Sequence, residues 1–315
     1  ERQFSEACRD LRRIHGAVAG EPHAAHRAAV QLAQALHDKM LSGGDLFVRV
    51  VDDAQVDRLT AHALNVTVVA MLLGRVIELS DAEMAELGVG ALFHDVGKLE
   101  LPDRLRLPQD DFSAAESNLY REHVAQGVAL GQRMGLSTAV LQMIGQHHEM
   151  ADRSGFPAGL RGEEMSMGAR IVAMVNHYDN LCNASVPSRS LTPHEALSRM
   201  FAQSRHRFDP ALLNHFIRLM GIYPPGSLVQ LSDDRYAMVM TVNPARPLKP
   251  SVLVADRGVP RDQALHLDLN GAPGLGIRRS LRVDQLPTHV ADYLSPQPRV
   301  AYFFDVEARG GLEAS

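Results

Sequence analysis

The sequence predicts a mainly α-helical bundle that is followed by a small antiparallel β appendage. Apolar residues recur at helical spacing up to about residue 223, and capping boxes at Ser80, Ser113 and Thr192 each have a glutamate three residues later. From Pro224-Pro225-Gly226 onward the apolar residues alternate as they do in strands. We therefore expect three parts, which are an N-terminal helical segment at 1–44, a main helical domain at 45–223 and a β-rich extension at 224–315.

The composition limits the classes of protein to which this chain belongs. Its 32 lysines and arginines face 37 aspartates and glutamates, and the net charge of −5 argues against a DNA- or RNA-binding protein. Cys8 and Cys182 form neither a zinc-ligand spacing nor a disulfide framework, which fits a reducing cytoplasm. We find no signal peptide and no run of about 18 apolar residues, so we expect a cytoplasmic location without a membrane span.

The first elements are two helices within residues 1–43, of which the second begins at Pro22. Residues 45–56 are ambiguous, because an alternating apolar pattern leads directly into a helical one. The helical pattern then continues over residues 57–79 and carries His62 on its apolar face.

The next helices bring further polar groups of the metal-binding type. Three of these helices begin at a serine cap. The helix capped by Ser80 carries His94-Asp95, the helix capped by Ser113 carries His123, and the helix capped by Ser137 carries His147-His148. A helix from Ser166 to about Asn180 holds Asn176 and Asp179. Later helices begin at Thr192 and Asp209. The expected elements after these are strands at Leu228–Leu231, Tyr236–Val242, Ser251–Val254 and Val300–Phe304, with a short helix near Thr288–Tyr293.

The His-Asp pair in the segment Ala91-Leu92-Phe93-His94-Asp95-Val96-Gly97-Lys98 is the centre of a predicted metal site. Imidazoles bind iron, zinc, manganese or nickel, and a carboxylate can bridge two ions. A single buried histidine is more often a core residue with satisfied hydrogen bonds. Here five successive helical segments each supply one or two such groups near an apolar face, and that ordered series predicts metal binding.

These motifs resemble the HD superfamily of metal-dependent phosphohydrolases and, more narrowly, the HD-GYP family of cyclic di-GMP phosphodiesterases. The resemblance covers about residues 45–223. It rests on His62-Ala63-Leu64-Asn65-Val66, His94-Asp95-Val96-Gly97-Lys98, Arg121-Glu122-His123, His147-His148-Glu149, Ser154-Gly155-Phe156-Pro157 and Gly159-Leu160-Arg161-Gly162-Glu163-Glu164. It implies an HD-type helical bundle that hydrolyses cyclic di-GMP to linear pGpG, and onward to GMP, in bacterial second-messenger signalling.

The resemblance also implies a cofactor and roles for individual residues. Two divalent metal ions are expected, iron or manganese first, with zinc, nickel or magnesium as alternatives. Asp95 would bridge the ions and act in catalysis with Lys98, which would bind a phosphate oxygen; a lysine at a helix end is otherwise a solvated cation. The implied metal ligands are His62, His94, Asp95, His123, His147, His148 and Asn176. The implied substrate-binding residues are Lys98, Gly155, Phe156, Pro157, Arg161 and Arg189.

Several positions depart from the family's pattern. Phe156 replaces the tyrosine of Gly-Tyr-Pro, and Asn176 replaces the aspartate that supplies the last ligand. Arg58 stands where members with three metal ions have a glutamate, so we expect no third ion. The basic segment that contacts phosphate in the family is reduced to residues 184–190, where Arg189 is the only cation.

Two alternatives to the hydrolysis of cyclic di-GMP follow from these departures. The first is a catalytically weak or inactive module that binds proteins or nucleotides through the Gly155-Phe156-Pro157 loop. The second is an HD phosphohydrolase for another nucleotide, such as a different cyclic dinucleotide. The expected partners are therefore a cyclic dinucleotide and proteins that bind this loop, and a dimer is compatible with each of these functions.

Overall fold

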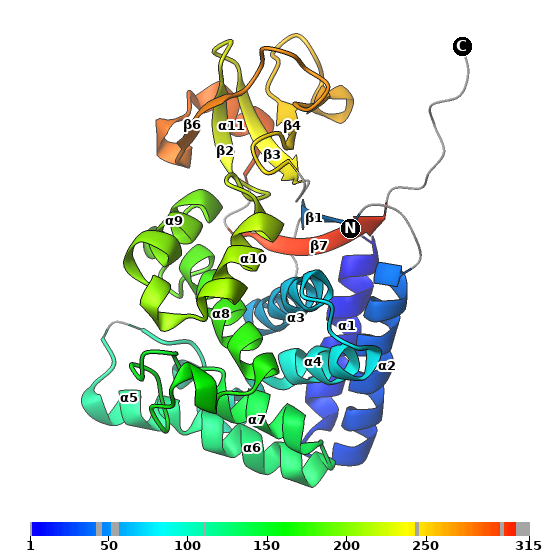
Figure 1. The fold of residues 1–315 in the computed structure, drawn as a ribbon, viewed down its shortest axis with the longest axis vertical. Helices are drawn as coiled ribbons and strands as arrows, with labels where there is room; N and C mark the ends of the chain where they lie inside the picture. Colours follow the sequence, from blue (N-terminus) through cyan, green and yellow to red (C-terminus); the bar gives the residue numbers. More distant parts are fainter. Residues whose placement is uncertain are drawn as a thin grey trace.

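A body of helices carries a smaller antiparallel sheet at one end (Figure 1). The computed structural model describes residues 2–41, 46–51, 57–109, 111–242, 246–296 and 299–306. Strands β1 (Leu46–Val51) and β7 (Ala301–Val306) lie where the sheet meets the helices. This arrangement confirms the predicted fold class, a mainly α-helical bundle with a small antiparallel β part.

The helices α1 (Arg2–Ala17) and α2 (Pro22–Leu41) form the expected N-terminal pair. Leu11 and Ile14 of α1, and Val18 just after its end, are buried at helical spacing. Both helices share one hydrophobic cluster with the helices that follow, and α2 packs against α4 (Asp81–Phe93). The boundary proposed after residue 44 stays a prediction, because packing crosses it.

The helix α3 (Arg58–Val76) runs through the centre of the body, and its side chains from Ala63 to Gly74 are all buried. An 18-residue window of this helix has a mean hydropathy of 1.5, so the helix is long and apolar enough to cross a membrane by length and composition alone. The sequence analysis overlooked this window. Because 78% of it is buried inside the protein, its place in the core accounts for its apolar character.

A tight turn follows α4, and His94 and Asp95 lie in this turn and not within the helix that begins after Ser80. The α-helix ends at Phe93, and a 3-10 helix, η1 (Val96–Glu100), follows His94 and Asp95. A Cβ atom at Gly97 would lie 1.9 Å from the carbonyl oxygen of His123, so only glycine permits this contact with the next helix. The chain therefore continues after α4 as η1, which packs closely against α6.

The helix predicted from Ser113 to Gly135 is divided in the structure. It consists of α5 (Ala114–Arg121) and α6 (His123–Met134), which meet at Glu122. The division places His123 at the first position of α6. The remaining elements of the helical body are η2 (Asp103–Leu105), α7 (Thr138–Gln146), η3 (Gly162–Glu164), α8 (Met167–Cys182), η4 (Pro187–Arg189), α9 (Pro193–Gln203), η5 (Arg205–Arg207) and α10 (Pro210–Met220).

The sheet contains seven strands, and one of them comes from outside the predicted β-rich extension. Strand β1 settles the ambiguity for residues 46–51, because Leu46–Val51 pairs with β7 along its whole length, whereas residues 45 and 52–56 lie outside the described residues. It also pairs with β3 at one position, Arg49 opposite Thr241. The other elements of this part are β2 (Leu228–Leu231), β3 (Tyr236–Thr241), β4 (Ser251–Val254), η6 (Arg261–Gln263), β5 (His266–Asp268), β6 (Ile277–Leu281), η7 (Val283–Gln285) and α11 (Thr288–Leu294).

Candidate metal centre

Six of the predicted metal ligands converge between α3, η1, α6 and the end of α7. They form two groups in which the ligand atoms lie within 4.8 Å of one another. The groups are His62, His94 and Asp95, and Asp95, His123, His147 and His148. Five histidines and one aspartate that are spread over 87 positions of the sequence thus form one centre with two halves.

Asp95 belongs to both halves and turns one carboxylate oxygen towards each. Its Oδ2 atom lies 3.5 Å from Nε2 of His62 and 3.5 Å from Nε2 of His94. Its Oδ1 atom lies 3.5 Å from Nε2 of His123 and 3.4 Å from Nε2 of His147. This is the arrangement expected of a carboxylate that bridges two ions.

The turn at the end of α7 brings two neighbouring histidines into the same half. The α-helix ends at Gln146, so His147 and His148 lie beyond it. In an unbroken helix two neighbouring side chains would point in different directions, whereas here both can reach the same half of the centre. The Nε2 atom of His123 lies 3.3 Å from Nε2 of His147 and 3.2 Å from Nε2 of His148. The sequence left open whether the pair serves one position or two, and the structure places both in one group.

Backbone carbonyl groups fix the orientation of three of the imidazoles. The Nδ1 atoms of His94, His123 and His147 lie 2.8, 2.5 and 2.7 Å from the carbonyl oxygens of the residues three positions earlier. With the proton on Nδ1, each ring donates to its carbonyl and points the lone pair of Nε2 into the centre. Metal-binding histidines are oriented in this way.

The donor set fits divalent metal ions. The Nε2 atoms of His62 and His94 are 3.2 Å apart, and two lone pairs at that distance repel each other unless a cation lies beside them. Asp95 Oδ1 is buried and has no hydrogen-bond partner among the described residues. A buried acceptor without a donor is costly, and a metal ion would satisfy it.

The protonation states also favour metal binding. Burial lowers the pKa of His94 to about 4 and that of His123 to about 3, so both rings are neutral near pH 7. Burial and the neighbouring imidazoles likewise lower the pKa of His148. Burial acts to raise the pKa of Asp95, but Lys98 and His94 outweigh it and hold that pKa well below its usual range.

Asp179 on α8 holds His62 from behind, a role that the sequence analysis missed. Its Oδ2 atom lies 2.6 Å from Nδ1 of His62, and its Oδ1 atom accepts hydrogen bonds from Asn65 and Asn183 at 2.8 and 3.0 Å. A carboxylate behind a ligating histidine fixes the ring and raises its basicity. The only signal in the sequence was the position of Asp179 on the same helix as Asn176.

Asn176 is buried on α8, the helix that also carries Asp179. Its Oδ1 atom accepts a hydrogen bond of 2.6 Å from the side chain of Asn180, one turn later on α8. Its assignment as a metal ligand therefore stays a prediction.

Lys98 lies at the centre, as expected, and pairs with the bridging carboxylate. Its Nζ atom donates to Asp95 Oδ2 at 2.6 Å and lies 5.4 Å from the centroid of the Tyr120 ring. The side chain is 6% exposed, so the reading of Lys98 as a solvated helix-end cation is wrong. Although burial opposes it, the carboxylate raises the pKa of Lys98, which therefore stays charged.

The Gly155-Phe156-Pro157 loop lies directly against the histidines, as the sequence analysis expected. The Phe156 ring stacks on His148 with the ring centroids 4.5 Å apart, and the Arg121 guanidinium lies 5.0 Å from the Phe156 centroid. A Cβ atom at Gly155 would lie 2.5 Å from the backbone of residues 148–150, so glycine is required there. The role of the loop in substrate binding stays a prediction.

Glu149 holds the other side of this loop. Its buried carboxylate accepts hydrogen bonds from the backbone N–H groups of Ala158, Gly159 and Leu160 at 2.6, 3.1 and 2.9 Å. The sequence analysis quoted Glu149 without a role. The turn that carries two metal ligands is thereby fastened to the loop.

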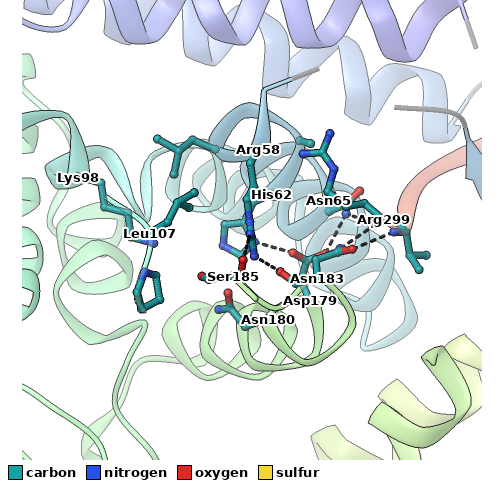
Figure 2. A pocket seen from close by; sticks show the side chains of 14 residues that line it. Arg58, His62, Asn65, Lys98, Leu107, Asp179, Asn180, Asn183, Ser185 and Arg299 are labelled. Atoms are coloured by element: carbon teal, nitrogen blue, oxygen red, sulfur yellow. Dashed lines mark hydrogen bonds and ion pairs between the residues drawn. The ribbon is translucent and has the colours of Figure 1, made fainter. Parts of the chain in front are cut away.

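A small pocket adjoins the centre at His62 and Lys98 (Figure 2). Arg161 and Arg189, which we expected to bind substrate, do not line it. Arg161 lies 3.6 Å from Glu163, and Arg189 is exposed on η4. Two cations that the sequence analysis did not assign to the substrate, Arg58 and Arg299, line the pocket instead.

Comparisons with known proteins agree with this site. A family model for the HD domain matches residues 49–212. The cyclic di-GMP phosphodiesterase PA4108 of Pseudomonas aeruginosa is 32% identical over 194 residues, which are 61% of this chain and 47% of that protein. The 3'3'-cGAMP-specific phosphodiesterase 3 of Vibrio cholerae is 27% identical over 179 residues, 56% of this chain and 38% of that protein.

A solved structure shares the fold. The HDG"Y"P protein Bd1817 from Bdellovibrio bacteriovorus superposes with a TM-score of 0.51 at 21% identity, and the match covers 68% of each chain. The chain spans about half the length, or less, of the curated relatives named above. The likeness therefore concerns the domain that contains the metal centre.

Proposed function

The chain belongs to the HD-GYP family of HD-domain proteins, and we propose that it hydrolyses cyclic di-GMP to linear pGpG, and onward to GMP, in bacterial second-messenger signalling. One observation carries the proposal. Asp95 turns one oxygen to each of two groups of imidazoles, and this donor set matches a two-metal phosphodiesterase site. The name printed for PA4108 supports the choice of substrate.

We propose iron or manganese as the resident metals, with zinc, nickel or magnesium as alternatives. Imidazole-rich sites with one carboxylate suit the transition metals among these. Two bound divalent ions supply Lewis-acid chemistry, because they polarise a phosphoryl oxygen and make water a better nucleophile at neutral pH. The ligands for them are His62, His94, Asp95, His123, His147 and His148.

The side chains of the protein supply the remaining steps. Lys98, charged and almost fully buried, is placed to neutralise a phosphate oxygen of the substrate. Asp179 keeps His62 in its orientation, and the Phe156 ring covers the outer face of His148. These groups position the substrate and exclude water from one side of the centre.

The experiment is incubation of metal-loaded protein with cyclic di-GMP, followed by chromatography for pGpG and GMP, with metal analysis of the same samples. We expect two ions per chain and conversion of the substrate. A variant that combines His94→Ala with Asp95→Ala should retain at most one weakly held ion and no activity. Two ions in that variant, or no product from the loaded wild type, would refute the proposal.

Two other functions remain candidates, one because of particular residues and the other because of a relative's name. Asn176 and Phe156 favour a weak or inactive module that binds proteins or nucleotides. The name of the Vibrio cholerae relative favours another cyclic dinucleotide as substrate. Turnover of 3'3'-cGAMP in preference to cyclic di-GMP would support the latter, and tight binding without turnover would support the former.

The setting of this activity is part of the proposal. We propose that the protein works in the cytoplasm, where cyclic dinucleotides act. Protein partners would bind at the Gly155-Phe156-Pro157 loop, and a dimer is compatible with this arrangement. The net charge of −5 argues against DNA and RNA as partners.

A further inference from the structure

Three cationic side chains line the pocket beside the metal centre. Lys98, Arg58 and Arg299 line it together with a single carboxylate, that of Asp179. Lys98 lies at the end next to the metal ligands, where it pairs with Asp95. The two arginines come from distant parts of the chain, since Arg58 begins α3 and Arg299 immediately precedes Val300 and strand β7.

The backbone beside Arg299 is fixed by two asparagine side chains. The Val300 N–H group donates to Asn183 Oδ1 at 2.8 Å, and the Val300 carbonyl accepts from Asn65 and Asn183 at 2.8 and 2.9 Å. Asn65 Oδ1 accepts from the Tyr302 N–H group at 2.8 Å. The two side-chain amides thus pair with backbone N–H and C=O groups as a neighbouring strand would. They fix the backbone next to Arg299, which lines the pocket.

Arg58 is anchored to the same region. Its guanidinium donates to the carbonyl oxygen of Ser185 at 3.0 Å and to that of Asn183. Burial and the neighbouring positive charge of Arg299 lower the pKa of Arg58. Both guanidinium groups line the same pocket. Like charges repel each other, and an anion bound between these two groups would relieve that repulsion.

A cyclic dinucleotide has two phosphodiester groups, and only one can occupy the metal centre at a time. We infer that Arg299, together with Arg58, binds the second phosphate of the substrate while the first lies at the metal ligands and Lys98. The inference rests on the proposed function and adds a substrate-binding residue from outside the matched HD domain, residues 49–212. It also explains how phosphate is held although residues 184–190 contain only one cation.

The test compares substrates with two phosphates and with one. KM and kcat are measured for cyclic di-GMP and for bis(p-nitrophenyl) phosphate, which has a single phosphodiester, using Arg299→Gln, Arg299→Lys and the wild type. We expect Arg299→Gln to raise KM for cyclic di-GMP roughly 10- to 100-fold, because a charge-assisted contact is lost, with kcat little changed. KM for bis(p-nitrophenyl) phosphate should not change. Arg299→Lys should restore part of the affinity.

Arg257→Gln is the matched control, because Arg257 is an exposed arginine of the same β part that does not line the pocket. Metal content and melting temperature are measured for every variant, and both should equal those of the wild type. If Arg299→Gln behaves like Arg257→Gln, or impairs both substrates equally, the inference is wrong. A wild type that cleaves bis(p-nitrophenyl) phosphate but neither binds nor cleaves cyclic di-GMP would instead overturn the proposed function and this inference with it.

Discussion

The hydrogen bond between Asp179 and His62 links a metal ligand to a carboxylate that does not itself reach the centre. Asp179→Asn keeps the size of the side chain but removes its charge. We expect the affinity for metal to fall by about 10- to 100-fold while the fold is retained. Metal retained after dialysis against graded chelator concentrations, with thermal melting, measures both effects.

Asp10→Asn is the control for this change, because Asp10 pairs with Arg13 on the exposed side of α1. It should leave the metal affinity unaltered. If Asp179→Asn also leaves it unaltered, the carboxylate behind His62 has no influence on the ligand.

Asn176 is the residue at which the site differs most from its family. Its amide is buried one turn before Asn180 on α8, the helix whose Asp179 contacts His62, and a carboxylate there would add a negative charge to this helix. We expect Asn176→Asp to tighten one metal and raise turnover. The measurement is the rate of hydrolysis against added Mn²⁺ or Fe²⁺, with Asn180→Asp as a neighbouring control. A rate and metal dependence like those of the wild type would place Asn176 outside the ligand set.

At the scale of secondary structure, the contact between η1 and α6 sets the distance between Asp95 and His123. A Cβ atom at Gly97 would meet the backbone of His123 at 1.9 Å and that of Gly127 at 2.5 Å, and backbone atoms cannot move aside as a side chain can. We expect Gly97→Ala to destabilise the protein by more than about 2 kcal/mol and to reduce its metal content. Urea unfolding and metal analysis measure these effects.

Gly16→Ala is the matched substitution, because Gly16 lies in α1 and a Cβ atom there would meet nothing within 4 Å. It should leave stability unchanged or raise it by up to about 1 kcal/mol. Equal effects of the two alanines would show that the packing of η1 on α6 is not the constraint.

Helix beginnings could be predicted from the sequence, but helix interruptions could not. Ser80 and Ser113 begin α4 and α5 with the expected capping boxes, because such a box depends only on residues three positions apart. The ends of α4 at Phe93 and of α5 at Arg121 lie next to η1 and α6, which pack together from distant parts of the sequence, and no local pattern reveals such packing. Those two interruptions are what bring Asp95 and His123 together.

The molecule as a whole should lose stability in acid when no metal is bound. The pKa values of His94 and His123 are about 4 and about 3 in the folded protein, against an ordinary value of 6.5. At a pH between the folded and the ordinary pKa values, the unfolded chain therefore binds more protons than the folded protein. The free energy of unfolding falls as the pH drops below 6.5. Each histidine contributes a loss on the order of 2 kcal/mol at pH 5.

Urea unfolding of the metal-free protein between pH 7.5 and pH 5 measures this loss. A stability that stays constant over that range would contradict the burial of neutral imidazoles.

The convergence of six candidate metal ligands could be predicted from the sequence, whereas the hydrogen bonds that support them could not. His62, His94, Asp95, His123, His147 and His148 fall within a matched family pattern whose order along the chain is informative. Asp179 depends on Asn65 and Asn183, and these in turn bind Val300, more than a hundred positions away from either. The pairing of β1 with β7 spans the chain in the same way, and spacing within a window cannot reveal it.

The asparagine contacts with β7 also constrain when the site can be completed during synthesis. Asn65 binds the backbone of Tyr302, which the ribosome adds 237 positions later. Domains begin to fold from the N-terminal side, and contacts between distant residues form slowly. All six metal ligands therefore emerge long before the strand that fixes Asn65 and Asn183. A nascent chain presents these residues around an unfinished support until strand β7 has emerged, so we expect tight metal uptake only after that point.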